Sequence, residues 1–133
     1  MAVNSPYRSS SDLVLEVLSR AGVLSIGQAV DVDDFQTVSK NLDSIFRKIA
    51  GLEICFVADA DNIPGTWFSD LVDIVLGESA KDIGLSGQEY IDAVNKGLGG
   101  LGPVDVGAGA AAKSLKIISR GRPTYEPLRF VNY

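Results

Sequence analysis

The sequence predicts an all-α fold, in which a four-helix antiparallel bundle precedes an extended C-terminal arm. Apolar residues recur at intervals of three and four in four segments between residues 11 and 98, which is the period of a helix with one buried face. Capping residues or glycines mark most ends of these segments, and the segments follow one another closely. A chain of 133 residues, 46% of them hydrophobic, is long enough to bury the core of one compact domain.

The first two predicted helices cover residues 11–21 and 33–50. Gly22 offers the first helix a C-terminal stop. Asp33 can cap the second helix, because Gln36 stands three residues later at the capping-box position. The two apolar stripes consist of Leu13, Val14, Val17, Leu18 and Ala21, and of Phe35, Val38, Leu42, Ile45, Phe46 and Ile49.

One short strand and two more helices follow. Residues 53–58 are apolar and β-prone and precede a run of turn residues, which predicts a strand or an extended crossing. Thr66 can cap a third helix that ends near residues 82–84, and the capping box from Ser86 to Glu89 opens a fourth. The fourth helix has Tyr90, Ile91, Val94 and Leu98 on one face. The predicted core of the bundle contains Phe35, Leu42, Phe46, Trp67, Leu71 and Val75.

The composition divides the chain into three parts. Residues 1–96 are expected to form the helical bundle. Residues 97–112 predict a flexible linker, because six glycines fall within 13 residues and three alanines follow. Residues 113–133 predict a basic, aromatic C-terminal arm that begins with one or two helical turns. Pro123 and Pro127 keep the rest of this arm extended.

Charge is also divided unevenly along the chain. Residues 1–112 carry 16 acids and 7 bases, a net charge of −9, whereas residues 113–133 carry 1 acid and 5 bases, a net charge of +4. The acidic body disfavours nucleic-acid binding through phosphate contacts, while the basic end suits an acidic partner surface. Because the sequence has neither a long apolar run nor a signal-peptide pattern, we expect no membrane anchor and no export.

The absence of histidine removes much of the usual chemistry of enzymes. It excludes Ser-His-Asp and Cys-His catalysis and His-ligated metals. The single cysteine, Cys55, lies in an apolar run and is expected to be a buried thiol in a reducing compartment. We therefore expect no catalytic residue, no cofactor and no metal.

Several short patterns resemble chemical motifs, but their context is wrong. The glycines of residues 97–102 match a dinucleotide fingerprint, although a helix precedes them and Pro103 follows. Residues 107–114 differ from a phosphate-binding loop by an alanine where the motif requires glycine. Acidic side chains leave open a carboxylate-dependent cell-wall hydrolase, although their spacing singles out no pair. The acids available for it are Asp59, Asp61, Glu78 and Glu89.

The order of features between residues 11 and 95 resembles a family of phage proteins. The run from Asp12 to Val23, DLVLEVLSRAGV, is followed by an acidic spacer and by the long predicted helix of residues 33–50. This arrangement resembles the head-to-tail connector adaptors of tailed bacteriophages, and most of all the tail accessory factors of P22-like short-tailed phages. Ala21 stands where that family has leucine, and the region after residue 97 corresponds by position only.

The resemblance implies a structural virion protein at the head-tail junction, assembled in the host cytoplasm. Such adaptors form a homo-oligomeric ring, usually dodecameric, beneath the portal protein. The ring extends the DNA channel, lets DNA pass without tight binding, and offers a platform to the next tail protein, a nozzle or hub. No membrane takes part in this assembly.

The C-terminal arm is expected to bind the portal, because its bases can orient it and its large side chains can fill pockets. Two alternatives stay open: the cell-wall hydrolase and a helical regulatory domain that binds a protein partner. The residues expected to bind the portal are Lys113, Lys116, Arg120, Arg122, Tyr125, Leu128, Arg129, Phe130 and Tyr133.

Overall fold

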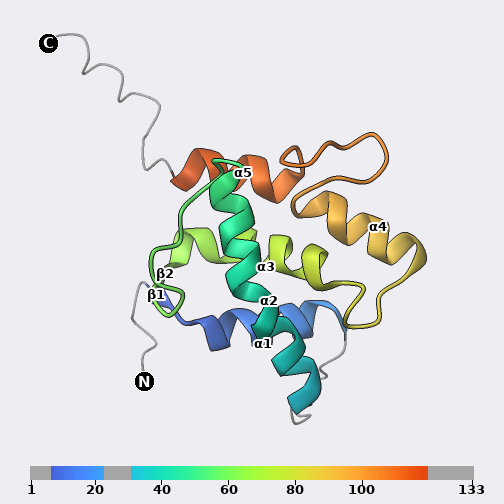
Figure 1. Ribbon diagram of the computed structural model, residues 1–133, viewed down its shortest axis with the longest axis horizontal. Coiled ribbons are helices and arrows are strands. Elements are labelled where there is room, and N and C mark those ends of the chain that lie inside the picture. Colours follow the sequence, from blue (N-terminus) through green and yellow to red (C-terminus); the bar gives the residue numbers. More distant parts are fainter. Residues whose placement is uncertain (1–6, 23–30, 120–133) are drawn as a thin grey trace, which may run out of the picture.

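The computed structural model describes residues 7–22 and 31–119, and these residues are mostly helical (Figure 1). The predicted all-α class is therefore confirmed. Two strands of two residues each pair in antiparallel fashion, with Tyr7 opposite Pro64 and Arg8 opposite Ile63. In chain order the elements are β1 (Tyr7–Arg8), α1 (Ser10–Arg20), α2 (Val32–Gly51), β2 (Ile63–Pro64), α3 (Gly65–Ser79), α4 (Gly87–Lys96) and α5 (Ala110–Ser119).

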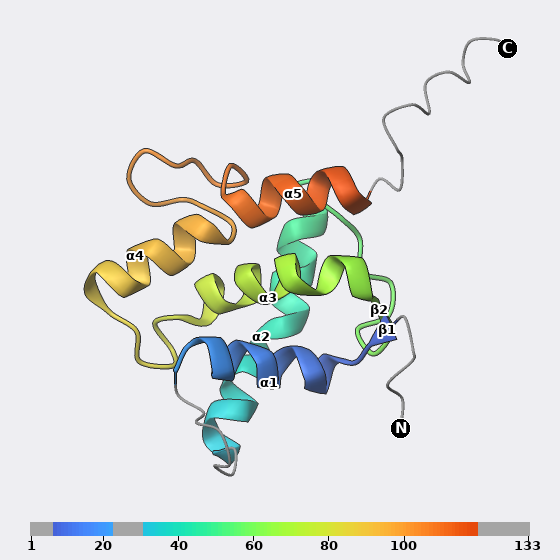
Figure 2. The same ribbon diagram turned by 180° about the vertical axis from the view of Figure 1, so that it is seen from behind.

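Helix α3 lies at the centre of the molecule and contacts each of the other four described helices. Helices α1, α3 and α5 lie one above another, while α2 crosses α1 and α3 on one face (Figures 1 and 2). Helix α4 packs against α3 and α5. The structure thus describes four helices around a central fifth, and the predicted four-helix antiparallel bundle is not confirmed.

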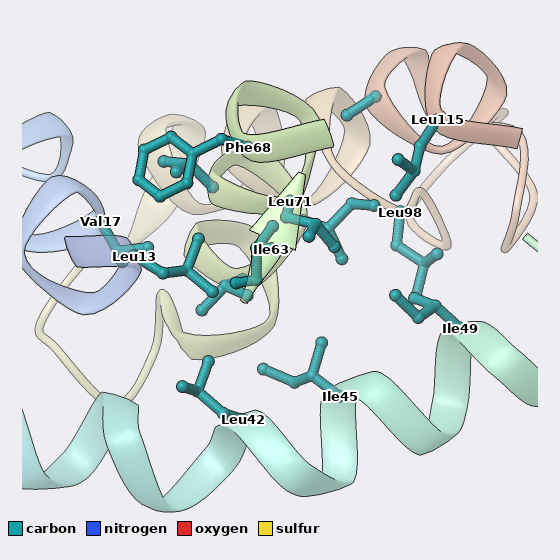
Figure 3. Close-up of a cluster of buried hydrophobic side chains, with 14 of the residues drawn as sticks. Leu13, Val17, Leu42, Ile45, Ile49, Ile63, Phe68, Leu71, Leu98 and Leu115 are labelled. Atoms are coloured by element: carbon teal, nitrogen blue, oxygen red, sulfur yellow. The ribbon is translucent and has the colours of Figure 1, made fainter. Parts of the chain in front are cut away.

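The core gathers apolar side chains from all of these helices around α3. Leu71, Val72, Ile74 and Val75 are adjacent or nearly adjacent in sequence, yet all four are fully buried, because neighbouring helices surround α3. Figure 3 shows the side chains of α1, α2, α3 and α5 directed into one cluster. Of the six predicted core residues, Leu42, Leu71 and Val75 are buried, whereas Phe35, Phe46 and Trp67 are partly buried and pack against the cluster.

Helix ends follow the expected capping chemistry in α1 and depart from it in α2. Ser9 caps α1 in a capping box with Asp12, and Gly22 follows the helix with a positive φ of 82°, as a C-terminal stop requires. The cap of α2 is Asp31, whose side chain accepts hydrogen bonds from the N–H groups of Asp33 and Asp34. The prediction that Asp33 is the cap was wrong, because the helix begins two residues earlier and Asp31 accepts from the free N–H groups of its first turn.

Three further local predictions are corrected by the structure. Of the two forms predicted for residues 53–58, a strand or an extended crossing, the strand is not found, and the short β1 strand pairs with residues 63 and 64. Helix α3 begins after Pro64 rather than at a Thr66 cap, and no side chain caps it. Ser86 does precede α4 as predicted, but its side chain makes no capping hydrogen bond.

The glycine-rich loop between α4 and α5 makes close backbone contacts with the body, although its composition predicts a flexible linker. The N–H groups of Gly107 and Gly109 both donate to the Leu98 carbonyl, at 2.8 and 3.2 Å, and Leu98 is fully buried. A Cβ at Gly97 would lie 2.5 Å from the Asp73 carbonyl oxygen of α3. Glycine is therefore needed here for close approach of two backbones, and the loop fastens α5 to the body.

Candidate functional site

The outer face of α5 carries the two predicted site residues that the structure describes. Lys113 and Lys116 are both exposed there. The opposite face of α5 buries Ala111, Ala112 and Leu115, and α5 packs against α3. Small alanines let the two helices approach closely, so the lysines are held on a fixed helix rather than on a loose segment.

The last turn of α5 is fastened to the chain that follows α2. The Ser119 hydroxyl donates a hydrogen bond to the Ile54 carbonyl oxygen at 2.9 Å. These two residues are 65 positions apart in the sequence. The contact therefore brings the end of α5 beside residues 52–62, which run along the same end of the molecule (Figures 1 and 2).

Exposed apolar side chains lie close in sequence to both partners of this contact. Phe56 is 71% exposed and Ile117 is 67% exposed, and Leu52 and Ile118 are exposed to a smaller extent. All four lie within two positions of either Ser119 or Ile54 in the sequence. We call Leu52, Phe56, Ile117 and Ile118 the apolar end, and large exposed apolar groups of this kind often mark a binding surface.

Two hollows lie beside Phe56. One, of about 320 Å³, lies between α2 and the chain after it and is lined by Phe46, Ala50, Phe56 and Val57 among others. The second, of about 220 Å³, shares Phe56 and Val57 and is lined by Trp67 on its other side. Phe56 therefore stands as an exposed ring between two shallow, partly apolar depressions.

The chain beside the apolar end is acidic. Residues 52–62, which we call the acidic segment, carry Glu53, Asp59 and Asp61 and contain no lysine or arginine. The Ser10 hydroxyl donates to Asp61 at 2.6 Å, and hydrogen bonds from the Ser10 side chain and backbone lower the pKa of Asp61. These hydrogen bonds favour the charged form of Asp61 and tie the end of the acidic segment to the start of α1.

Sequence reasoning missed the apolar end. The run from Ile54 to Val57 reads as uniformly apolar, so nothing in it separates the buried Ile54 and Cys55 from the exposed Phe56. Ile117 and Ile118 are likewise preceded by the buried Leu115, and only the helical phase of α5 distinguishes them. A helical-wheel reading of residues 110–119 would have placed Ile117 opposite Leu115.

The candidate hydrolase carboxylates do not form one site. Asp59 and Asp61 precede the N-terminus of α3, whereas Glu78 lies in the last turn of that helix. Fifteen helical residues span about 20 Å, whereas a glycosidase pair stands roughly 5 to 9.5 Å apart. Glu78 is also engaged by the Lys48 ammonium at 2.8 Å, and Glu89 lies on α4.

The motif-like glycines use their own N–H groups within the loop. Gly99 donates to the Val94 carbonyl oxygen at 2.7 Å, and Ala112 donates to the Gly97 carbonyl oxygen at 3.1 Å. A phosphate-binding loop needs such N–H groups directed at its ligand. Within the described residues, no group of three metal-ligating side chains lies together.

Cys55 is a buried free thiol, as its apolar surroundings predicted. Burial raises its pKa to about 11, so the sulfur is a neutral thiol at physiological pH. A neutral, buried thiol is a poor nucleophile, and Cys55 serves as part of the core.

Most of the predicted portal-binding residues fall outside the part of the chain that the structure describes. These are Arg120, Arg122, Tyr125, Leu128, Arg129, Phe130 and Tyr133. Comparison with known proteins finds no match to this chain among protein-family models, curated proteins or solved structures. None of the described helices has the length and apolar character that crossing a membrane requires.

Proposed function

We propose that this chain is a structural virion protein, a head-to-tail adaptor of a tailed bacteriophage. Copies of the chain form a homo-oligomeric ring, with twelve-fold or similar symmetry, beneath the portal protein, as the resemblance over residues 11–95 implies. The ring continues the DNA channel and provides a platform for the next tail protein. It carries out no covalent chemistry and uses no cofactor.

The observation that supports this proposal most is the separation of charge between body and end. The first 112 residues carry a net charge of −9, whereas the basic face of α5 leads directly into residues 120–133 with Arg120, Arg122 and Arg129. An acidic body would let DNA slide past without phosphate contacts. The basic, aromatic C-terminal arm would dock on an acidic partner.

The apolar and the basic side chains of the C-terminal arm would have separate tasks in portal binding. Leu128, Phe130 and Tyr133 would fill pockets on the portal and determine how slowly the complex dissociates. The arginines would guide the encounter, because charges at the rim of an interface act mainly on association rate. Pro123 and Pro127 would reduce the entropy lost when the end becomes ordered.

The decisive experiment mixes the full chain with its cognate portal ring. Light scattering and electron microscopy are expected to show a ring of the protein seated under the portal. A chain that stays apart from portal rings at all concentrations would refute the adaptor function. Tight duplex-DNA binding that persists when Lys113 and Lys116 are replaced by glutamine would favour a regulator instead.

Kinetic measurements on variants test the proposed division of tasks. Phe130→Ala is expected to speed dissociation from the portal. Arg122→Ala is expected to slow association, by an amount that shrinks as salt screens the attraction. Lys40→Ala, which removes one exposed positive charge from α2, is the matched control and should leave both rates unchanged. If Arg122→Ala changes only the dissociation rate, and salt does not alter the size of that change, the arginine does not guide association electrostatically.

A helical regulatory domain that binds a protein partner is the second candidate, and the apolar end favours it. Phe56 and Ile117 could serve any protein ligand, with no ring required. Light scattering separates the two candidates, because a regulator would bind its partner in a small complex of fixed composition. A peptidoglycan-release assay tests the hydrolase alternative, for which a negative result is expected.

A further inference from the structure

We propose that residues 120–133 dock on the body of their own chain, in the hollows on either side of Phe56. We call these residues the tail segment. The proposal concerns the free chain and does not depend on the adaptor function. It assigns an occupant to the apolar end and the depressions beside it.

The position at which α5 ends is the first reason. The Ser119 hydroxyl donates a hydrogen bond to the Ile54 carbonyl oxygen, and Ile54 stands two positions before Phe56 in the same chain. The tail segment, which follows Ser119 directly, therefore starts close to Phe56. The hollows beside Phe56 are lined in part by residues 56–60, which lie within about 20 Å of Ile54 even in an extended chain. Fourteen residues reach roughly 45 to 50 Å when extended, so the tail segment can cover both hollows.

The second reason is apolar complementarity between the body and the tail segment: the body exposes an aromatic ring beside hollows, and the tail segment has large apolar side chains. Phe56 presents most of its ring to solvent, between hollows lined by Phe46 and Trp67. The tail segment contains large side chains, Leu128 and Phe130 among them, that belong to no helical stripe of the sequence. Covering an aromatic ring with such groups removes apolar surface from water and stabilises the docked state.

Charge complementarity is the third reason. The acidic segment carries three acids and no base, whereas the tail segment carries three arginines and one acid, Glu126. Asp59 lines the second hollow, whereas Asp43 in the first hollow is already paired with Arg47 of the same lining at 3.1 Å. The complementarity therefore rests on Asp59 and on the excess of acids in the acidic segment. Arginine is well suited to carboxylates because its planar group can donate two parallel hydrogen bonds.

Attachment within one chain makes even a weak contact sufficient. A short flexible connection gives an effective concentration of about 1 mM. A tail segment that would bind as a free peptide with a Kd of about 100 µM would therefore be docked about ten times as often as not. The same weak affinity would leave separate chains unassociated at micromolar concentration.

Photo-cross-linking of the full chain tests the proposal. Phe130 is replaced by the photoreactive p-benzoylphenylalanine, and the protein is irradiated at about 1 µM, far below the effective concentration within a chain. The expected product is an internal cross-link in a monomer, mapped by mass spectrometry to peptides containing residues 43–67. Circular dichroism of every variant confirms that the helical fold is retained.

A matched pair of substitutions shows whether Phe56 is the docking partner. Phe56→Ser is expected to weaken docking about five- to tenfold, because loss of an aromatic anchor costs that much binding. From a docked fraction of about nine tenths, this lowers the internal cross-link about 1.4- to 1.8-fold. Val32→Ser is the control, since Val32 is 64% exposed at the opposite end of α2. It should leave the yield unchanged.

Three results would overturn the proposal. The first is an internal cross-link that maps outside residues 43–67 or is absent. The second is a yield that Phe56→Ser and Val32→Ser change equally. The third is a product that joins two chains and grows with protein concentration, which would place the tail segment on a second copy instead.

Discussion

Replacement of Gly97 by alanine tests whether the glycine-rich loop is part of the folded body. An ideal Cβ at this position would lie 2.5 Å from the Asp73 carbonyl oxygen and 2.9 Å from the Ile74 Cα. Both atoms belong to the backbone of α3, which cannot move aside as a flexible side chain can. The φ of Gly97 is −83°, so close contact rather than a left-handed backbone requires glycine here.

The expected cost follows from these contacts. Forcing an extra methyl into a packed site destabilises by about 1 to 3 kcal/mol, and the rigid neighbours of Gly97 place it in the upper half of that range. Alanine recovers roughly 0.4 to 1 kcal/mol by reducing the entropy of the unfolded chain. The net loss is therefore about 1 to 2.6 kcal/mol, equivalent to a fall in Tm of about 4 to 9 °C for a chain of this length.

Urea unfolding followed by Trp67 fluorescence and by circular dichroism measures this loss. Gly51→Ala is the matched control, because a Cβ at Gly51 would meet no atom within 4 Å and the residue ends α2. It should be neutral or slightly stabilising. If Gly97→Ala is tolerated as well as Gly51→Ala, the loop is not packed against α3 and behaves as the flexible linker that composition suggests.

Three other outcomes are expected. Leu71→Ala should destabilise the fold by about 2 to 5 kcal/mol, because Leu71 is fully buried. Phe46→Ala should cost less, because the Phe46 ring is only partly buried. Equal losses of the free energy of unfolding in urea would contradict this packing. The lowered pKa of Asp61 stabilises the fold above the ordinary carboxyl pKa of about 4. In unfolding titrations the advantage of wild type over Ser10→Ala should shrink as pH falls below that value and be lost below the lowered pKa. Native Cys55 should react slowly with a thiol reagent, and fast labelling at pH 8 would show that the thiol is accessible. The free energy of unfolding should fall as pH rises from about 9 towards 11, because the thiol of the unfolded chain loses its proton first.

The sequence by itself determined the helices with a clear period and the division of charge. The stripes of α1 and α2 follow from intervals of three and four, and Gly22 ends α1 as its backbone freedom allows. The excess of bases after residue 112 is a property of composition and needs no structure. These features are local, because a helix forms its hydrogen bonds within a few residues along the chain.

Only the tertiary structure decided which apolar residues are buried and what the glycines do. Residues 53–58 have the composition of a strand, but a strand needs a partner, and the structure pairs β1 with Ile63 and Pro64. Gly97 resembles a linker residue until the backbone of α3 is placed against it. The contact between Ser119 and Ile54 joins residues 65 positions apart, and such contacts leave no local pattern in a sequence.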